Sequence, residues 1–379
     1  MNVSLSGARG LVLVSTLLLS TTAFAAPDAT KIANSVVAAL QAKGGAKASF
    51  DSASANGDDV VITNLKVSRE GSDATVPSVV IASPVERTPG GFTAASISFD
   101  NGKIVDGEQT ISWKTGISKD AVVPDPTEVH STAKITPFSH FEIDGISVAA
   151  PNAPDPVTVD SFAVDLSNVV DGAPNEGKLT VAGINVPGSV LKAAGQGSST
   201  LTDLGYDSLS LNVGIAGSYD AAKSALTING ITLDGKDMGK LSISGTFGGV
   251  PREKLQNADQ LHELAPTATL EVAEVRFDDA GLTNRALDMQ AKQLGAKRED
   301  LAAMVPGFLP LAFSQVNITD EAFQSEVSAA VSAYLKDPKS ITVKFAPATP
   351  VLLTEVGKTA LASPNGVLKL LGIGVSANN

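Results

Sequence analysis

The sequence contains no cysteine, and this absence removes several kinds of chemistry at once. Without cysteine the chain has no disulfide, no thiolate metal ligand, no cysteine nucleophile and no cysteine that could carry a lipid anchor. Such a chain must be stabilised by its hydrophobic core. With 379 residues it is long enough to bury the core of one large domain or two ordinary domains, and the sequence leaves that choice open.

Familiar catalytic and metal-binding motifs are missing or incomplete. His130, His140 and His262 lie in different segments without ligand spacing. The VGKT sequence at residues 356–359 lacks the first glycine of a phosphate loop, and SVLK and KTG occur in the wrong order for a penicillin-recognising enzyme. We therefore predict no catalytic residues, no metal site and no cofactor. An exported glycan hydrolase using Asp and Glu is kept as an alternative.

Two pairs of adjacent carboxylates have simpler structural interpretations. The pair at residues 58–59 follows an Asn-Gly sequence, which is typical of a turn. The pair at residues 278–279 precedes a predicted helix and can cap it. Neither pair by itself indicates a catalytic site.

Residues 1–25 have the pattern of a signal peptide. Arg9 precedes the nine-residue apolar run LVLVSTLLL, and the small-residue sequence AFA ends at Ala25. The run is too short to span a bilayer, which takes about 20 residues. We predict cleavage after Ala25 and a mature chain without a transmembrane segment. We expect it in the periplasm of a Gram-negative-type envelope, with secretion as the alternative.

Acidic residues outnumber basic residues in the predicted mature chain, which has 40 Asp and Glu against 27 Lys and Arg. A surface with this balance repels nucleic acid and anionic lipid headgroups. The acidic residues are scattered along the chain, as is typical of a solvated surface. We therefore exclude nucleic acid as a partner.

The N-terminal two thirds of the chain predict one helix followed by a sheet. In residues 26–46, Ile32, Val36 and Leu40 share one helical face behind Asp28 as a cap. Residues 47–270 consist of short alternating runs separated by Gly, Pro, Asn and Asp. The run LSLNVGIAG, from Leu209, alternates large apolar residues with Ser, Asn and Gly. This pattern indicates an antiparallel sheet with one solvated face.

One eight-residue spacing recurs in this region: apolar, polar, apolar, two spacers, apolar, polar, apolar. A two-residue hairpin turn would suit an Asn-Gly spacer but not Ala-Glu or Asp-Ser. A β-bulge adds one residue to a continuous strand, so that all four apolar side chains stay on one face, and it explains every copy. We predict bulged strands for FEIDGISV (141–148), VTVDSFAV (157–164), LTVAGINV (179–186), LTINGITL (226–233) and LEVAEVRF (270–277).

Residues 271–379 predict mainly helices with one or two closing strands. A first pair of helices is separated near Gly295, and a stronger helix follows with Thr319 as its cap and Pro338 beyond its end. SITVKF is a predicted strand, two short helices follow it, and IGVSANN is a last short strand. The predicted fold is α+β: an elongated, curved antiparallel sheet of bulged strands and hairpins, with a short N-terminal helix and a helix-rich C-terminal region.

The run LAAMVPGFLPLAF, residues 301–313, has no charged or strongly polar side chain. It is too short to span a membrane. We favour a buried helical hairpin broken at Pro306 and Pro310 over a lip that meets an apolar ligand, because long apolar runs are mostly buried. It is nevertheless the best candidate for ligand contact, through its large apolar side chains: Leu301, Met304, Val305, Phe308, Leu309, Leu311 and Phe313.

The bent octets, followed by DDAGLTNRALDMQAKQLG and ITVKFAPATPVLLTEV, resemble exported Gram-negative envelope proteins of AsmA-like and other β-repeat type. The resemblance covers about residues 60–379, includes no catalytic motif and implies a lipid-related envelope role. We therefore predict a non-enzymatic periplasmic protein that is structural or binds an apolar, lipid-like ligand or an envelope protein along its sheet. A protein-binding scaffold and the glycan hydrolase are the alternatives, and the oligomeric state is left open.

Overall fold

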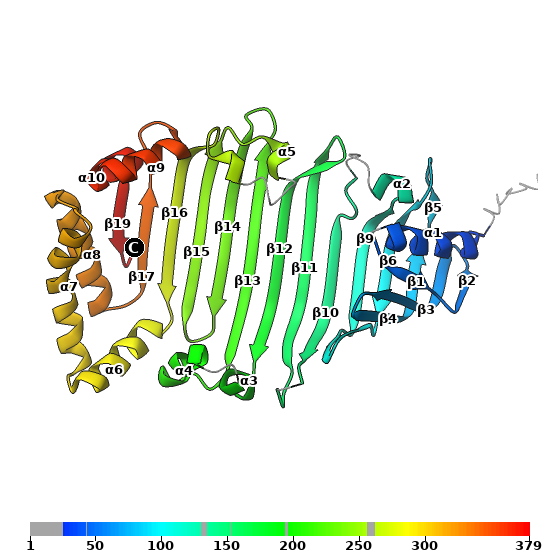
Figure 1. Ribbon diagram of the computed structural model, residues 1–379, viewed down its shortest axis with the longest axis horizontal. Coiled ribbons are helices and arrows are strands. Elements are labelled where there is room, and N and C mark those ends of the chain that lie inside the picture. Colours follow the sequence, from blue (N-terminus) through cyan, green and yellow to red (C-terminus); the bar gives the residue numbers. More distant parts are fainter. Residues whose placement is uncertain (1–25, 43, 130–134, 152, 194–195, 256–261) are drawn as a thin grey trace, which may run out of the picture.

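The structure, a computed structural model, describes residues 26–42, 44–129, 135–151, 153–193, 196–255 and 262–379. Its strands form one sheet in which all pairings are antiparallel. Figure 1 shows this sheet extending along the long axis, with the longer helices at its two ends and short helices along the edges of its middle. The predicted α+β class and elongated antiparallel sheet are confirmed.

The N-terminal part is one helix packed on nine strands. Helix α1 (Ala29–Ala42) begins where the Asp28 carboxylate accepts a hydrogen bond from the backbone N–H of Lys31 at 3.0 Å, so the predicted cap is confirmed. The strands are β1 (Lys47–Ser49), β2 (Ser52–Asn56), β3 (Asp59–Arg69), β4 (Ser72–Ala82), β5 (Val85–Glu86), β6 (Phe92–Asp100), β7 (Lys103–Asp106), β8 (Gln109–Ser112) and β9 (Thr115–Val123).

The middle of the sheet is a meander, in which each long strand pairs with the next strand of the chain. Its strands are β10 (His140–Ala149), β11 (Val157–Val170), β12 (Ala173–Val186), β13 (Leu209–Asp220), β14 (Ala225–Gly235), β15 (Gly239–Gly248) and β16 (Thr269–Asp279). Short helices lie in the connections: α2 (Pro126–Val129), α3 (Gly188–Ala193), α4 (Gln196–Asp203) and α5 (Arg252–Leu255).

After β16 the chain leaves the sheet through three helices and returns to extend it. Strand β17 pairs with β16, and β19 pairs with β17. Helix α8 lies beside β19, where the Glu326 carboxylate accepts a hydrogen bond from the backbone N–H of Val375 at 2.7 Å. The elements are α6 (Leu282–Leu294), α7 (Arg298–Gln315), α8 (Glu321–Lys336), β17 (Ser340–Phe345), β18 (Val351–Leu352), α9 (Leu353–Ala362), α10 (Pro364–Leu371) and β19 (Ile373–Ala377).

The main hydrophobic core lies at the N-terminal end, between α1 and the strands beneath it. Ile32 and Ala33 of α1 pack with Val60 and Ile62 of β3 and with Ile81 of β4, and all five side chains are buried. The long strands β10, β11 and β13 contain no fully buried residue. The middle of the molecule is therefore a single layer of sheet that is accessible from both sides.

Most predicted C-terminal elements are confirmed, with two corrections. The helices α6 and α7 separate at Gly295, which ends α6 in a left-handed conformation. The cap of α8 is Asp320 and not Thr319, because the Asp320 carboxylate accepts the hydrogen bond from the backbone N–H of Phe323 at 3.1 Å. The prediction of a helical hairpin in residues 301–313 is wrong, because α7 is one continuous helix that contains both prolines.

The prolines of α7 each remove a backbone donor, yet the helix continues through them because it packs against α8. Among the helices of the described residues, none has the length and apolar character needed to cross a bilayer. The predicted signal peptide, its cut after Ala25 and His130 lie outside the described residues.

Candidate ligand-binding face

One face of the sheet carries two continuous rows of apolar side chains, and we call it the apolar face. Each row consists of direct register partners on nine successive strands, from β10 to β17 and then β19. The first row is Phe141, Val164, Leu179, Ile215, Ile231, Ile243, Val275, Val343 and Val375. The second row is Ile143, Phe162, Val181, Val213, Leu233, Leu241, Phe277, Ile341 and Ala377. Because register partners point to the same side of a sheet, the rows make a continuous surface.

Bulges keep the apolar residues of the repeated octets on this face. In β14 the register shifts between Ile228 and Ile231, so Asn229 and Gly230 occupy a bulge inside a continuous strand. In β12 the register shifts between Val181 and Ile184 relative to β13. The bulge prediction is confirmed at both octets.

The other three octets also lie in continuous strands, but they bend differently. The pairing register of β10 with β11 is the same on both sides of Gly145. The spacer residues of these two octets therefore lie side by side, and neither strand has an extra residue relative to the other. In β16 the register shift falls at Glu271, before the predicted spacer. Val272 is therefore turned to the opposite face, where it is exposed, and the predicted bulge position in this octet is wrong.

The apolar face is covered at its N-terminal end and open in its middle. Successive register pairs connect Ile81 in the covered core to Phe141 in the first row, by way of Ile97 and Ser118. The covered core and the first row therefore lie on one face of the sheet. Under α1 the side chain of Ile81 is 0% exposed. In the middle, the exposed fractions of three row residues are much larger: 45% for Ile215, 36% for Ile231 and 45% for Leu233.

Aromatic rings occupy the junction between the covered and open parts. The Phe99 and Phe141 rings are stacked with their centroids 5.6 Å apart. Phe138 and Phe162 lie 5.5 Å and 6.4 Å from Phe141. The open part of the apolar face therefore has a wall of aromatic side chains at its N-terminal end.

The opposite face of the same strands is built from small and polar residues. Its central row of register partners is Ala163, Thr180, Gly214, Thr232, Ser242, Arg276, Thr342 and Ser376. Such side chains are suited to water. The sheet is thus amphipathic, as the alternation in the sequence predicts, but the residues that the structure describes form no layer over the middle of its apolar side.

A tyrosine and an arginine meet at each end of β13. The Tyr219 hydroxyl donates to the Val250 carbonyl at 3.0 Å, and the Arg252 guanidinium lies 5.1 Å from the ring centre. Before the other end, Tyr206 donates to the Asp237 carbonyl at 2.9 Å, and the guanidinium of Arg285 lies 4.6 Å from its ring.

Sequence reasoning missed both tyrosine–arginine pairs, since their partners are far apart in the chain and belong to no motif. They lie near the two ends of β13, the strand that carries the exposed Ile215.

The candidate contact residues of the sequence lie away from this face, on α7 at the C-terminal end. Leu301 and Phe313 are buried, and Leu309 is half-buried. The four remaining candidates are exposed, so the interpretation of the run as core is wrong for most of its large side chains: Met304, Val305, Phe308 and Leu311.

Several carboxylates of the described residues form ion pairs within the protein: Asp51 with Lys66, Glu128 with Arg87 and Asp220 with Lys223. No group of three or more His, Asp and Glu residues in the described part of the chain is close enough to hold a metal ion. The carboxyl pKa values that are shifted are all lowered: by a Lys66 hydrogen bond at Asp51, by Thr127 at Asp125, by Arg87 at Glu128 and by Lys223 at Asp220. A glycosidase acid needs the opposite shift.

One carboxylate of each adjacent pair has the structural role predicted from the sequence, whereas Asp59 lies in β3 and Asp278 pairs with Arg276. Asp58 lies in the turn between β2 and β3. The Asp279 carboxylate accepts hydrogen bonds from the backbone N–H groups of Gly281 and Thr283 at 2.8 Å and 2.9 Å, at the start of α6.

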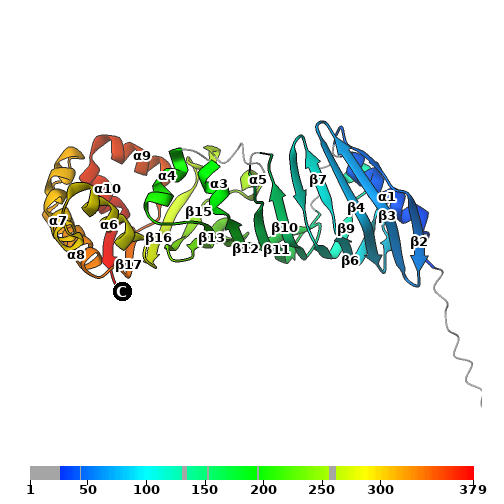
Figure 2. The same cartoon turned by 90° about the horizontal axis from the view of Figure 1, so that it is seen from below.

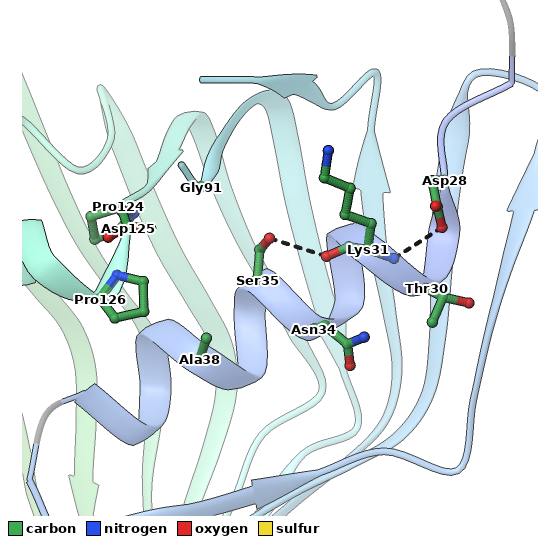
Figure 3. Close-up of a pocket in the computed structure, with 10 residues that line it drawn as sticks. All are labelled: Asp28, Thr30, Lys31, Asn34, Ser35, Ala38, Gly91, Pro124, Asp125 and Pro126. Carbon is green, nitrogen blue, oxygen red and sulfur yellow. Dashed lines mark hydrogen bonds between the residues drawn. The ribbon is translucent and has the colours of Figure 1, made fainter. Parts of the chain in front are cut away.

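A polar pocket of about 540 Å³ lies beside α1, as Figure 3 shows. Its charged groups are already engaged within the protein. The Lys31 ammonium contacts Glu86 at 2.5 Å, and the Asp125 carboxylate accepts hydrogen bonds from the hydroxyl and N–H of Thr127 at 2.6 Å and 2.9 Å. Because the charged side chains of the pocket are already paired with neighbouring residues, the open apolar face is the better candidate site.

Comparison with known proteins gives a partial match and no activity. A family model described as an uncharacterized protein matches residues 232–378, which begin within β14 and include the helices α6 to α10. No curated protein matches the chain. The matched segment contains the strands of the apolar face from β15 to β19, the exposed Leu233 of β14 and all of α7.

Proposed function

We propose that this protein is a non-enzymatic periplasmic protein of the cell envelope that binds a lipid-like ligand along the open apolar face of its sheet. The observation that carries the proposal is the exposure of Ile215, Ile231 and Leu233 in the middle of two unbroken apolar rows. Exposed apolar side chains that adjoin one another in this way are typical of a ligand-binding or interaction surface.

The chemistry of the face favours a hydrocarbon chain as the ligand. The backbone N–H and C=O groups of β13 and β14 are paired within the sheet. These strands therefore have no free edge to which a peptide could add as a further strand. A ligand with polar groups along its length would leave them unpaired against Ile231 and Leu233, at a cost of about 1–3 kcal/mol for each group. An acyl chain has no such groups and can lie across successive strands.

The proposal is tested by binding of cis-parinaric acid, a fluorescent fatty acid, to the purified full chain. The double variant Ile231→Asn with Leu233→Asn places two amides in the middle of the apolar face, and we expect its affinity to fall about tenfold or more. Fluorescence titration measures the change. Thr232→Asn with Asp234→Asn is the matched control, because these residues alternate with the first pair on the opposite face.

The control pair should bind the fatty acid as the unchanged chain does. Circular dichroism of both double variants establishes that they are folded. Failure of the unchanged chain to bind any fatty acid, or equal binding by the two double variants, contradicts the proposal; in the first case the protein-binding scaffold becomes the better interpretation of the face.

A further inference from the structure

Helix α7 carries a second exposed apolar surface that the sheet face does not explain. Met304, Phe308 and Leu311 are spaced by four and three residues and therefore share one side of the helix, with Val305 beside them. Their exposed fractions are 51% for Met304, 59% for Phe308 and 61% for Leu311. We call these four residues the α7 patch.

The α7 patch lies at one extreme of the molecule. Both views show α7 at the C-terminal end of the long axis, and α8 separates it from β19 (Figures 1 and 2). Leu301 near the start of α7 and Phe313 near its end are buried, so both ends of the helix are held to the protein, whereas the α7 patch between them is exposed. No charged residue occurs in residues 301–319.

The charge of this end differs from that of the remaining chain. Residues 282–379 contain nine basic and eight acidic residues, whereas residues 1–281 contain 19 basic and 32 acidic residues. The acidic part is repelled by anionic headgroups, but the end that carries α7 is close to neutral. The protein can therefore approach a lipid surface with α7 foremost, because this end carries little net charge that anionic headgroups would repel.

The size of the α7 patch argues against a stable pair of chains. Four partly exposed side chains present roughly 300–500 Å² of apolar surface, whereas a stable protein interface buries about 800 Å² on each partner. A bilayer does not require a large complementary surface, because its apolar interior has no fixed shape to match and each inserted apolar side chain gains from burial separately.

We propose that the α7 patch docks the protein on the surface of a lipid bilayer, with α7 lying in the interface and the sheet directed away from it. Phe308 and Leu311 are the main inserted side chains. This contact depends on apolar burial rather than on charge and is independent of ligand binding by the sheet.

Flotation of the full chain with vesicles tests the docking. One set of vesicles is phosphatidylcholine, and the other is phosphatidylethanolamine with phosphatidylglycerol. We expect the protein to float with both sets, and Phe308→Ser with Leu311→Ser to reduce the bound fraction about tenfold. Val169→Ser with Val170→Ser is the matched control, since it removes two exposed apolar side chains from the acidic part; it should bind normally.

The absence of cysteine allows a direct measurement of insertion. A polarity-sensitive dye on Phe308→Cys should shift to the blue when vesicles are added, and the same dye on Val169→Cys should not. The proposal is overturned if the unchanged chain does not float, or if the Phe308 and Leu311 double variant floats equally well. It is also overturned if sedimentation shows a dimer that this double variant dissociates, since the α7 patch would then join two copies of the chain.

Discussion

At the scale of single residues, Gly116 shows how closely the covered part of the apolar face is packed. This glycine is the register partner of Ile143 and lies beneath the ring of Phe99. A Cβ atom at position 116 would come within 2.2 Å of the ring. The aromatic wall therefore depends on the missing side chain.

We expect Gly116→Ala to lower the free energy of unfolding by about 1–3 kcal/mol, because Phe99 must move away from Phe141. Gly357→Ala is the control, since a methyl group there meets no atom within 4 Å and lies inside α9. It should raise the free energy of unfolding by up to about 1 kcal/mol. Urea unfolding measures both; equal and small effects of the two substitutions would contradict the packing described for Phe99.

His140 makes stability depend on pH. Its Nδ1 atom lies 2.7 Å from Asp165 and its Nε2 atom 3.3 Å from Glu142. The hydrogen bond to Asp165 raises the pKa of His140 most, partial burial lowers it, and the hydrogen bond to Glu142 raises it further, with a net increase. A raised folded-state pKa means that the protonated histidine stabilises the fold below its unfolded pKa, and that this contribution is lost as pH rises through the folded pKa.

We therefore expect His140→Gln to destabilise the protein at about pH 5, by on the order of 1 kcal/mol or less, and to have little effect at about pH 9. Thermal unfolding across this pH range measures the difference from the unchanged chain. His262→Gln, which removes an exposed histidine, is the control. A destabilisation by His140→Gln that grows with pH would have the wrong sign.

At the scale of elements, the bulged strand allows an apolar pattern to continue past an irregularity. Ile228 and Ile231 of β14 face the same side because Asn229 adds one residue between them. Without the added residue, one half of the strand would present its apolar side chains to the opposite face.

Deletion of Asn229 should consequently turn Leu226 and Ile228 toward the polar face or force β14 out of register. We expect a loss of several kcal/mol in the free energy of unfolding, because two large apolar side chains exchange places with polar ones. Asn229→Ala keeps the residue count and should cost less than about 1 kcal/mol, since Asn229 is exposed. Differential scanning calorimetry compares the two; similar melting temperatures would refute the role of the bulge.

The elements predicted correctly from the sequence are those whose local pattern has one physical interpretation. The spacing of Ile32, Val36 and Leu40 fits only a helix. The octet that contains Asn229 fits a bulged strand better than a hairpin, because other copies of the octet have spacer residues that do not favour a hairpin turn. Helix α7 was misjudged because its prolines favour a break and its apolar residues favour burial. Packing on α8 overrides the first tendency, and the position of α7 at the molecular end overrides the second.

The candidate site was predictable in part for a related reason. The alternation of apolar and polar residues along the sequence reveals that one face of a strand is apolar, as it does for β13 and β14. It does not reveal whether another layer covers that face. Residues that meet only through the fold, such as Tyr206 and Arg285, leave no local pattern.

At the scale of the whole molecule, stability is unevenly distributed. The covered core between α1 and β3 contrasts with the single layer around β13 and β14. Strands with few buried apolar contacts open at lower free energy than core strands. The part that we propose to bind the ligand is thus less stabilised by buried contacts than the covered core.

Amide hydrogen exchange should resolve this gradient. We expect the amides of β3 and β4 to exchange about tenfold or more slowly than those of β13 and β14. Adding cis-parinaric acid should slow exchange in β13 and β14 and leave β3 unchanged, because only the open strands gain a covering layer. Uniform protection without the fatty acid would mean that the middle strands are stabilised independently of any covering layer.

From β10 to β16, each strand pairs with the next strand of the chain. Each added hairpin therefore lengthens both apolar rows by two strand widths and leaves the existing pairings in place. At about 4.8 Å for each strand, the nine-strand rows measure roughly 40 Å. If an acyl chain binds across the strands as we propose, the number of hairpins that the sequence encodes sets the length of chain that the apolar face can accommodate.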